Sequence, residues 1–543
     1  MALSFILLFV FELQTHNLAT ANFHSEFPLP DPAFTIKSDG SVDPSTAPIR
    51  RNGDIYTLTD NITGYTITIK RDNITLDGGG YTLQGTGIKA KNYGMELLNA
   101  GVYLQNRQGV TVRNMRISGF NVGIYMGTLF GDSSNNHFEN NLLTENYYGI
   151  SVGGSSCVFR NNVMENNTRN FNGGVKVDPR PLDLFVNDID TSNTVDGKPI
   201  IYWVNKHGLT VPFDAGCVIL VNCSDMTVQD LELSNNGHGI ALFSTTNSLI
   251  TKNNVTNSDS GMYIFDSSNL VISENNLNSN DNGIEARDSS NNNITSNSFT
   301  GNECGASFAG SQNNIIYENR FAASTRVAVR SNGLFNSTFA QNNIAGGNES
   351  GIELLYSGSN IITENRITGS GVGIRLTENS SLNMVSKNLI EDNKNGVLVR
   401  DSANNSIVGN MIAKNSGWGI QLTSNYLRSM NNLIYHNNFV ENNNHGIQAN
   451  VTANPDMQGS NYWDNGVEGN YWSDHNGGTP YFIVEGNKDI FPLLAPLEFN
   501  VPAVPMMEIE RTSSEPLSIF VASAVALIAV FVIAIIAVKK NRK

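Results

Sequence analysis

The sequence runs "GIALFSTTNSLITKNNVTNSDSGMYIF" from Gly239 to Phe265. Both ends carry the same pattern, a glycine followed by alternating side chains, and the second glycine, Gly261, follows the first by 22 residues. A period of two is typical of a β-strand, because successive side chains of a strand point to opposite faces. We therefore expect Ile240 and Leu242 on one face of a strand and Phe243 on the other.

The same glycine returns along most of the chain. Neighbouring members are mostly 22 or 23 residues apart. A unit of this length cannot hold a strand, a helix and a second strand, which need about 30 residues. Self-similarity at a fixed period is typical of a solenoid. We predict an all-β fold, a parallel β-helix whose coils of about 22 residues stack on one another. The glycines are Gly239, Gly261, Gly283, Gly305, Gly351, Gly373, Gly396, Gly419 and Gly446.

Asparagines recur in step with the glycines. Stacked at one turn of each coil, their amides would donate and accept hydrogen bonds along the solenoid, and asparagine tolerates left-handed turn conformations. We predict a buried structural ladder, and we expect Asn280 to lie outside it. The alternative is a solvent-facing row that binds sugars. The predicted members are Asn253, Asn275, Asn297, Asn319, Asn343, Asn365, Asn388, Asn410 and Asn437.

Composition narrows the function classes. The chain has 543 residues, of which 15% are charged, and a formal net charge of −15. A nucleic-acid-binding protein would need a basic surface, so we expect no nucleic-acid partner. The four cysteines do not indicate a pairing, although Cys217 and Cys223 are the nearest in sequence. Histidines and cysteines lack metal-ligand spacing, and we predict neither a metal site nor a cofactor.

The two ends predict export and anchoring. An apolar start precedes the small-residue cleavage pattern Ala19-Thr20-Ala21. Leu517 to Val538 carries no charge, and a helix of that length rises about 33 Å, enough to cross a bilayer. Basic residues follow it, which places the bulk of the chain outside the cell. We predict a signal peptide at 1–21, an N-terminal segment at 22–50, a β-helix at 51–460 with an insertion near 178–212, a cap at 461–497, a stalk at 498–516, a single transmembrane span at 517–538 and a cytoplasmic tail at 539–543.

His238 lies in a Gly-His-Gly sequence, which polygalacturonases carry in their active sites. Its position before the repeated glycine is taken by unrelated residues in other coils, such as Ser260, Asn282 and Val372. Glycosidic bond hydrolysis also needs clustered carboxylates, which are absent from the sequence around it. We interpret His238 as a turn residue and predict no catalytic residue there.

Four longer stretches resemble a known family. They are "DNITLDGGGYTLQGTG" from Asp72, "SNTVDGKPIIYWVN" from Ser192, "AGCVILVNCSDMTVQDLELSNNGHGI" from Ala215 and "NYWDNGVEGNYWSDHNGGTPYFI" from Asn461. These are similar to NosD-like right-handed β-helix proteins, over roughly 35–496. The resemblance implies a right-handed parallel β-helix and, in many members, a location at the cell surface.

The namesake of that family is a periplasmic accessory protein linked to copper-site assembly in nitrous oxide reductase. The resemblance therefore implies copper delivery as one possible function. Cu(I) prefers cysteine, methionine or clustered histidine. Here Met506 and Met507 fall in the predicted stalk and the eight histidines are scattered, so the ligand chemistry transfers poorly.

Our leading hypothesis is a membrane-anchored surface protein that binds a polysaccharide or a surface protein without catalysis. Its candidate binding residues are the outward-facing Phe243, Tyr263, Phe265, Glu285 and Arg287, and the aromatic Tyr462, Trp463, Tyr471 and Trp472. The last four are also suited to closing the end of the solenoid, which we favour, and the outward row could equally be ordinary solvated surface. The alternative is a polysaccharide lyase or hydrolase, for which Glu285, Arg287 and Asp288 form the best local set.

Overall fold

The computed structural model describes residues 32–88, 99–104, 106–127, 133–173, 182–453, 459–477, 480–484 and 486–500. The predicted signal peptide and the predicted span at 517–538 lie outside these residues. Within the described ranges, no helix has the length and apolar character needed to cross a membrane. Short 3-10 helices occur at η2 (Leu182–Phe185) and η3 (Asn443–His445), and the rest is strand, turn and coil.

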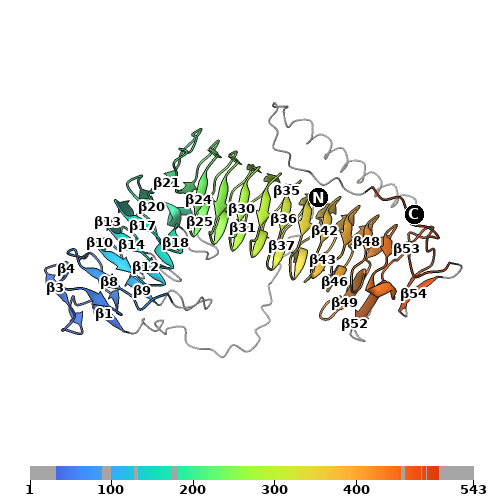
Figure 1. Cartoon of the computed structure of the whole chain (residues 1–543), viewed down its shortest axis with the longest axis horizontal. Coiled ribbons are helices and arrows are strands. Elements are labelled where there is room, and N and C mark those ends of the chain that lie inside the picture. Colours follow the sequence, from blue (N-terminus) through green and yellow to red (C-terminus); the bar gives the residue numbers. More distant parts are fainter. Residues whose placement is uncertain are drawn as a thin grey trace, which may run out of the picture. The chain divides into compact units, whose positions relative to one another are not determined.

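The N-terminal stack contains three sheets (Figure 1). The first comprises β1 (Ala33–Ile36), β2 (Val42–Asp43), β6 (Thr66–Ile69), β9 (Ala100–Tyr103), β12 (Val122–Met126), β15 (Tyr148–Val152) and β18 (Arg169–Asn172). The second comprises β3 (Ile49–Asn52), β4 (Ile55–Leu58), β7 (Thr75–Asp77), β10 (Thr111–Arg113), β13 (His137–Glu139), β16 (Val158–Arg160) and β19 (Asp188–Ile189). The third comprises β5 (Ile62–Thr63), β8 (Thr82–Gln84), β11 (Arg116–Ser118), β14 (Leu142–Thr144), β17 (Val163–Glu165) and β20 (Thr194–Val195).

The C-terminal stack begins at β21 (Lys198–Val204), which pairs antiparallel with β20. Its long sheet continues through β22 (Cys217–Val221), β25 (His238–Phe243), β28 (Ser260–Phe265), β31 (Asn282–Arg287), β34 (Cys304–Ala309), β37 (Val327–Asn332), β40 (Ser350–Leu355), β43 (Val372–Thr377), β46 (Asn395–Arg400), β49 (Ile420–Ser424) and β52 (Ala449–Ala453).

Two sheets of shorter strands complete each coil of this stack. One comprises β23 (Thr227–Gln229), β26 (Leu249–Thr251), β29 (Val271–Ser273), β32 (Asn293–Thr295), β35 (Ile315–Tyr317), β38 (Thr338–Ala340), β41 (Ile361–Thr363), β44 (Met384–Ser386), β47 (Ser406–Val408) and β50 (Leu433–Tyr435). The other comprises β24 (Glu232–Ser234), β27 (Asn254–Thr256), β30 (Asn276–Asn278), β33 (Ser298–Thr300), β36 (Arg320–Ala322), β39 (Asn343–Ala345), β42 (Arg366–Thr368), β45 (Leu389–Glu391), β48 (Met411–Ala413), β51 (Asn438–Val440) and β53 (Tyr471–Trp472). The hairpin of β54 (Tyr481–Val484) and β55 (Asn487–Asp489) follows.

The predicted fold is confirmed as an all-β parallel solenoid of the right-handed type. Strands of successive coils pair in parallel, as when Met262 of β28 lies opposite Ile240 of β25 and Ile284 of β31. The repeated glycine has a steric cause. A Cβ on Gly283 would lie 2.4 Å from the carbonyl oxygen of Gly305, the equivalent glycine of the next coil. The close approach of the next coil favours glycine at this corner, although Ala328 and Gln448 take the equivalent position in two coils and Gly446 lies outside the row.

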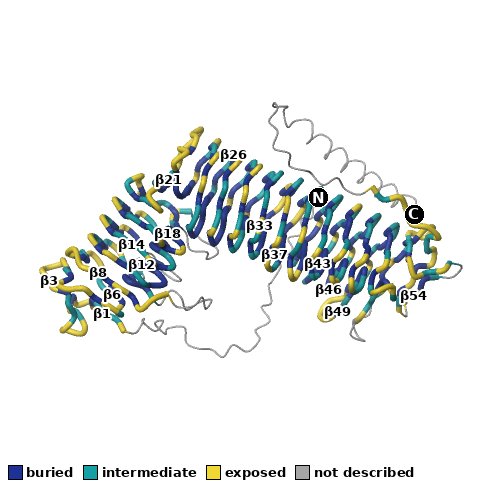
Figure 2. Tube along the Cα trace, viewed as in Figure 1, coloured by how far each residue is buried: buried dark blue, intermediate teal, exposed yellow. Residues whose placement is uncertain are grey.

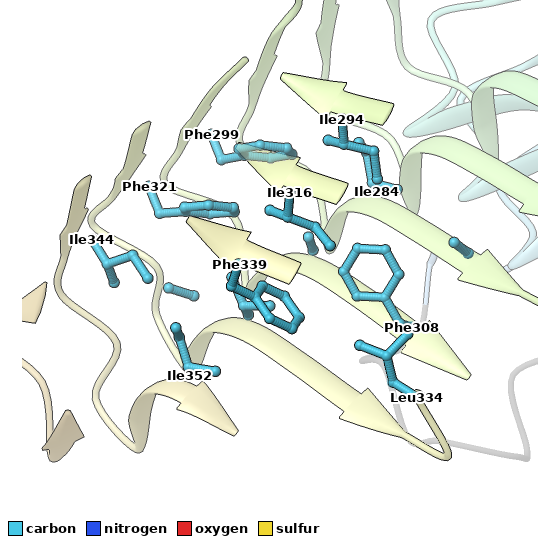
Figure 3. Packing of buried hydrophobic residues seen from close by; sticks show 14 of the residues in the cluster. Ile284, Ile294, Phe299, Phe308, Ile316, Phe321, Leu334, Phe339, Ile344 and Ile352 are labelled. Carbon is cyan, nitrogen blue, oxygen red and sulfur yellow. The ribbon is translucent and has the colours of Figure 1, made fainter. Parts of the chain in front are cut away.

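Each coil closes around an apolar interior. Figure 3 shows Phe299, Phe321 and Phe339 from successive coils turned into this space, and the rings of Phe299 and Phe321 stack with centroids 4.5 Å apart. Inward residues such as Ile284 and Ile316 are fully buried, and the exposed positions gather at turns (Figure 2). Because each coil buries its inner face only between its two neighbours, stability is shared along the stack.

The asparagine row forms a continuous hydrogen-bonded ladder. Asn275 Nδ2 donates to Asn297 Oδ1 at 2.9 Å, and Asn297 Nδ2 donates to Asn319 Oδ1 at 3.0 Å. The oxygen of Asn297 also accepts the backbone N–H of Asn275 at 2.9 Å. The row continues through Asn342, Asn365, Asn388, Asn410, Asn437 and Asn470.

Two expectations about these asparagines are wrong, and a third is incomplete. Asn343 is not in the ladder, because the coil step from Asn319 is 23 residues and Asn342 takes the position. Asn280 lies outside this ladder, as expected, but it is itself buried in a parallel row, where its Nδ2 donates to Val255 O and to Asn302 Oδ1. The ladder asparagines are also not the left-handed residues. The residue before each member from Asn253 to Asn437 is left-handed, for example Ser296 with φ 55°, and it turns the chain so that Asn297 points inward.

The two stacks meet on the outward face of the long sheet. The ring of Phe185, in η2, stacks on Phe243 of β25 with centroids 4.0 Å apart. Beside it, Gly237 donates its backbone N–H to Phe171 O of β18 at 2.9 Å. The end of the N-terminal stack therefore covers the outward face of β25 and β28.

A buried ion pair fastens this junction. Arg169 of β18 donates through Nε to Asp259 Oδ1 at 2.9 Å, and both side chains are about nine-tenths buried. The hydroxyl of Tyr148 donates to the other oxygen of Asp259 at 2.7 Å. Burial and the neighbouring carboxylate raise the pKa of Tyr148 far above its ordinary value, so its hydroxyl keeps the proton that it donates.

Candidate binding site

A hollow of about 280 Å³ opens on the outward face of the long sheet, beyond the part that the N-terminal stack covers. It spans three coils, at β31, β34 and β37. Cys304 and Ser307 of β34 lie between the neighbouring coils on either side. The lining residues are Asp281, Asn282, Glu303, Cys304, Ser307, Arg326 and Arg330.

The hollow exists because one coil carries small side chains. In the outward row, Ser307 lies in register between Glu285 of the preceding coil and Arg330 of the following one. In the next outward row, Ala309 lies between Arg287 and Asn332. In both rows a short side chain thus lies between two larger ones, which leaves a space one coil wide.

The charged groups of the hollow are paired across coils. Arg326 lies 3.0 Å from Glu303 and 3.7 Å from Glu349. Arg330 lies 3.5 Å from Glu353, which also approaches Arg375 at 3.8 Å. The Arg326 and Arg330 side chains keep more than a third of their surface exposed, so their guanidinium groups remain accessible.

The N-terminal stack reaches the rim of the hollow. Arg169, which pairs with Asp259, also approaches the lining residue Asp281 at 3.6 Å. The position of Asp281 therefore depends on the docking of the N-terminal stack. At the floor, burial raises the pKa of the Cys304 thiol to about 12, so the thiol is neutral and cannot act as a thiolate nucleophile at ordinary pH.

Three aromatic residues were predicted to form an exposed sugar-binding surface, but the structure buries them wholly or in part. Phe243 is fully buried, Tyr263 is 6% exposed and Phe265 is half-buried. Phe185 covers Phe243 and lies 6.1 Å from the ring of Phe265. The prediction failed because the packing of one stack against another cannot be read from a period within a single coil.

Glu285 and Arg287 lie beside the hollow but bind each other. Arg287 Nε donates to Glu285 Oε1 at 3.0 Å, and Ser260 Oγ donates to Glu285 Oε2 at 2.9 Å. Glu285 is only 6% exposed, so both of its oxygens are held inside the outward row. Asp288 follows in an exposed turn with φ 49°. Glu285 and Arg287 thus form a structural pair, and the three residues are not a convergent set of carboxylates.

Two of the four aromatic residues near the end of the chain close the apolar interior. Trp463 and Trp472 are each 1% exposed, and Trp472 stacks between Phe439 and Tyr481 with centroids 4.4 and 4.2 Å away. Buried rings cannot stack on a sugar. Tyr471 is half-buried, and Tyr462 is 56% exposed.

His238 is not a turn residue. It is the first residue of β25, is 1% exposed, and stacks on Tyr263 with ring centroids 4.7 Å apart. The expectation of a turn position is wrong because strand β25 starts one residue before the repeated glycine. His238 is in register with Ser260 and, one coil further, with the lining residue Asn282, but its own ring is buried rather than open to a ligand.

Metal-binding chemistry has little support in the described ranges. In them, no three His, Cys, Asp or Glu side chains are arranged to hold a metal ion. All four cysteines are buried, and no disulfide forms among them. Cys157 Sγ lies 3.7 Å from Met126 Sδ, but both atoms belong to the interior of the N-terminal stack.

Residues 58–194, 186–339 and 331–477 match the sequence model of one family, described as periplasmic copper-binding protein (NosD). These matches cover well over half of the 543 residues. The chain belongs to the NosD family. The donor set described above does not fit the copper of the NosD description.

Solved structures similar to this NosD-family chain are β-helix proteins. The periplasmic alginate epimerase AlgG is 13% identical with a TM-score of 0.34, covering 76% of this chain and 79% of its own. The mannuronan C-5 epimerase AlgE6 A-module of Azotobacter vinelandii is 15% identical with a TM-score of 0.27, covering 74% and 87%. A tailspike protein of E. coli bacteriophage HK620, in complex with a pentasaccharide, is 10% identical with a TM-score of 0.34, covering 73% of each chain. No curated protein sequence matches the chain.

Sequence reasoning missed most of the lining residues of this NosD-family hollow. The glycine row passes from Gly305 directly to Gly351, so it gives no signal for the coil of β37, where Arg330 is in register with Ser307 at a step of 23. A search that allowed steps of 22 or 23 would have found Arg330. Arg326 and Asp281 carry no such signal, because they lie in turns outside the strand alternation.

We expect the cap of this NosD-family chain to be more stable in acid than at neutral pH. Burial raises the pKa of Asp489, which accepts hydrogen bonds from Trp472 Nε1 and Asn470 N, and burial also raises the pKa of Asp474. A raised folded-state pKa stabilises the fold below the ordinary value near pH 4, and this stabilisation is lost as pH rises through the folded pKa.

The measurement is chemical unfolding followed by tryptophan fluorescence from pH 4 to 7, for the natural chain and for Asp489→Asn. As pH rises from 4 to 7, the free energy of unfolding of the natural chain should fall relative to that of Asp489→Asn. A shift in its favour would contradict the proposed sign.

Proposed function

We propose that the chain is an extracellular, membrane-anchored protein that binds carbohydrate in the hollow at β31, β34 and β37. The supporting observation is the hollow itself, an accessible space on a rigid sheet with hydrogen-bonding side chains on both sides. Binding sites on strands hold their groups more precisely than sites on loops. The predicted span at 517–538 and its basic tail support the location.

The lining suits a polyhydroxylated ligand. Its four charged residues are two acids, Asp281 and Glu303, and two bases, Arg326 and Arg330. Sugar hydroxyls donate and accept hydrogen bonds, so they can satisfy carboxylates and guanidinium groups together. At about 280 Å³, the space is near the lower limit of ligand pockets, which suits one sugar unit of a longer polymer.

The contacts of the acidic side chains favour binding without catalysis. A glycosidase needs an acid with a raised pKa and a second carboxylate at a set distance. Glu285 has both oxygens engaged by Arg287 and Ser260, and Glu303 is engaged by Arg326. Their contacts serve to hold the outward rows in shape.

The test fills the hollow without touching the interior. We expect Ser307→Trp to weaken binding by about tenfold or more, because a bulky ring would occupy the space and remove well over 1.4 kcal/mol of contact. The measurement is a glycan array with the full chain, followed by titration of the best ligand. Gln421→Trp, in the same outward row at β49, is the matched control and should bind normally.

Equal binding by the Ser307 and Gln421 variants would place the ligand elsewhere. Absence of any glycan bound by the natural chain would overturn the proposed function.

A further inference from the structure

Large apolar side chains are exposed at the C-terminal end of the described chain. They are Phe482 at 67%, Val484 at 39%, Ile490 at 47%, Phe491 at 43% and Leu494 at 83%. We call these five residues the end patch. They lie in β54 and in the segment after β55, at the orange-red end of the coils in Figure 1. Five large exposed apolar side chains within one short stretch of chain are more than the scattered single ones that a solvated surface usually carries, and they favour an interaction site.

The alternation of β54 explains why Phe482 faces away from the coils. Tyr481 is buried against Trp472, and Ile483 packs on the apolar interior. Phe482, which lies between them, therefore points to the opposite side, and Val484, after a shift of register in the hairpin, is exposed as well. Lys488 lies opposite Phe482 in the hairpin, with its Nζ 5.9 Å from the centre of that ring.

We propose that the end patch rests on the surface of a lipid bilayer. The inference depends on the proposed anchoring of the chain. Phe and Leu beside a Lys is a composition typical of interfacial membrane contacts, where the apolar groups enter the lipid and the lysine ammonium stays in water. The neighbouring Asp464, which accepts the backbone N–H of Ile490, disfavours attraction to anionic lipid. We therefore expect contact with zwitterionic lipid.

The short stretch of chain between the end patch and the predicted membrane span favours the bilayer, rather than a second copy of the protein, as the surface that the patch contacts. The apolar run begins at Leu517, and 16 residues separate it from the last described residue, Asn500. A chain of that length reaches at most about 55 Å even when fully extended. An anchored chain would thus hold the end patch near the bilayer at a high effective concentration.

The experiment uses the full chain reconstituted in phosphatidylcholine vesicles. All four native cysteines are buried, so a cysteine introduced at the surface can be labelled selectively. An environment-sensitive fluorophore on Leu494→Cys should be quenched by nitroxide-labelled lipids. The matched control is Tyr426→Cys, which is 80% exposed in the loop between β49 and β50. It should show no quenching.

A second variant tests the patch itself. Adding Phe482→Ser to the labelled chain should lower the fraction in contact by about tenfold, because one phenylalanine side chain leaves the lipid. Vesicle flotation tests the anchor separately, and failure to float would overturn the anchoring. Flotation without quenching at Leu494→Cys would overturn the end patch proposal alone. If the fluorescence of the label changed with protein concentration and not with the amount of lipid quencher, the end patch would contact a second copy of the protein. That result would also overturn the membrane proposal.

Discussion

Replacing Arg169 by alanine should lower the free energy of unfolding by about 3–5 kcal/mol, the usual cost of breaking a buried ion pair. The Asp259 carboxylate would stay buried with the Tyr148 hydroxyl as its remaining close partner. We also expect the two stacks to melt separately, because the same arginine fastens their junction. Differential scanning calorimetry would then show two transitions where the natural chain shows a more cooperative one.

The matched control is Arg400→Ala. Arg400 pairs with Glu378 at 3.1 Å, but both side chains are about one-third exposed. Exposed ion pairs contribute about 0–1 kcal/mol, so this change should cost little. Similar losses for both variants would mean that the junction does not depend on the buried pair. The Arg169 variant should also weaken glycan binding, because Asp281 at the rim loses its contact with Arg169.

The second large effect is expected from Asn297→Leu. The change removes the oxygen that accepts both the backbone N–H and the Nδ2 of Asn275. It also removes the donor to Asn319 Oδ1. Each buried group left without a partner costs about 1–3 kcal/mol. A weakened coil in the middle of a solenoid should divide its unfolding into separate steps, which thermal unfolding followed by circular dichroism would detect.

Asn276→Leu is the control for this change. Asn276 directly follows Asn275 in the preceding coil, is exposed, and its side chain makes only a long 3.3 Å bond to Asn254. Its replacement should leave the melting profile unchanged. If Asn297→Leu melted like the control, the ladder would contribute nothing measurable to stability.

The repeat unit was predictable because the interactions that define it lie within one coil or between adjacent coils. Inward residues such as Ile240 and Leu242 alternate within one strand, and glycine recurs where a Cβ would strike the next coil. The position of the ladder was predictable for the same reason, except where the step changed and Asn342 replaced Asn343. Each of these features depends on a coil and its immediate neighbours.

The candidate site was not predictable because it depends on distant parts of the chain. Phe243 looked like an exposed aromatic residue until the fold brought Phe185 against it. Likewise, the hollow arises where Ser307 happens to lie between Glu285 and Arg330, a relation visible only once the register is known. Alternation indicates which face a residue occupies, but not whether another stack covers that face.

The ladder and the glycine row together make the solenoid modular along its axis. Asn297 accepts a hydrogen bond from Asn275 and donates an equivalent one to Asn319. The two sides of a coil therefore match, so that any coil can stack on any other. A whole coil could be added or deleted and the two new neighbours would still match. A partial coil could not, because every later asparagine and glycine would shift out of register. The step of 27 residues from Asn410 to Asn437 keeps this rule by placing its extra residues in a surface loop. The length of such a protein can therefore change in whole coils, while the surface loops vary freely in size.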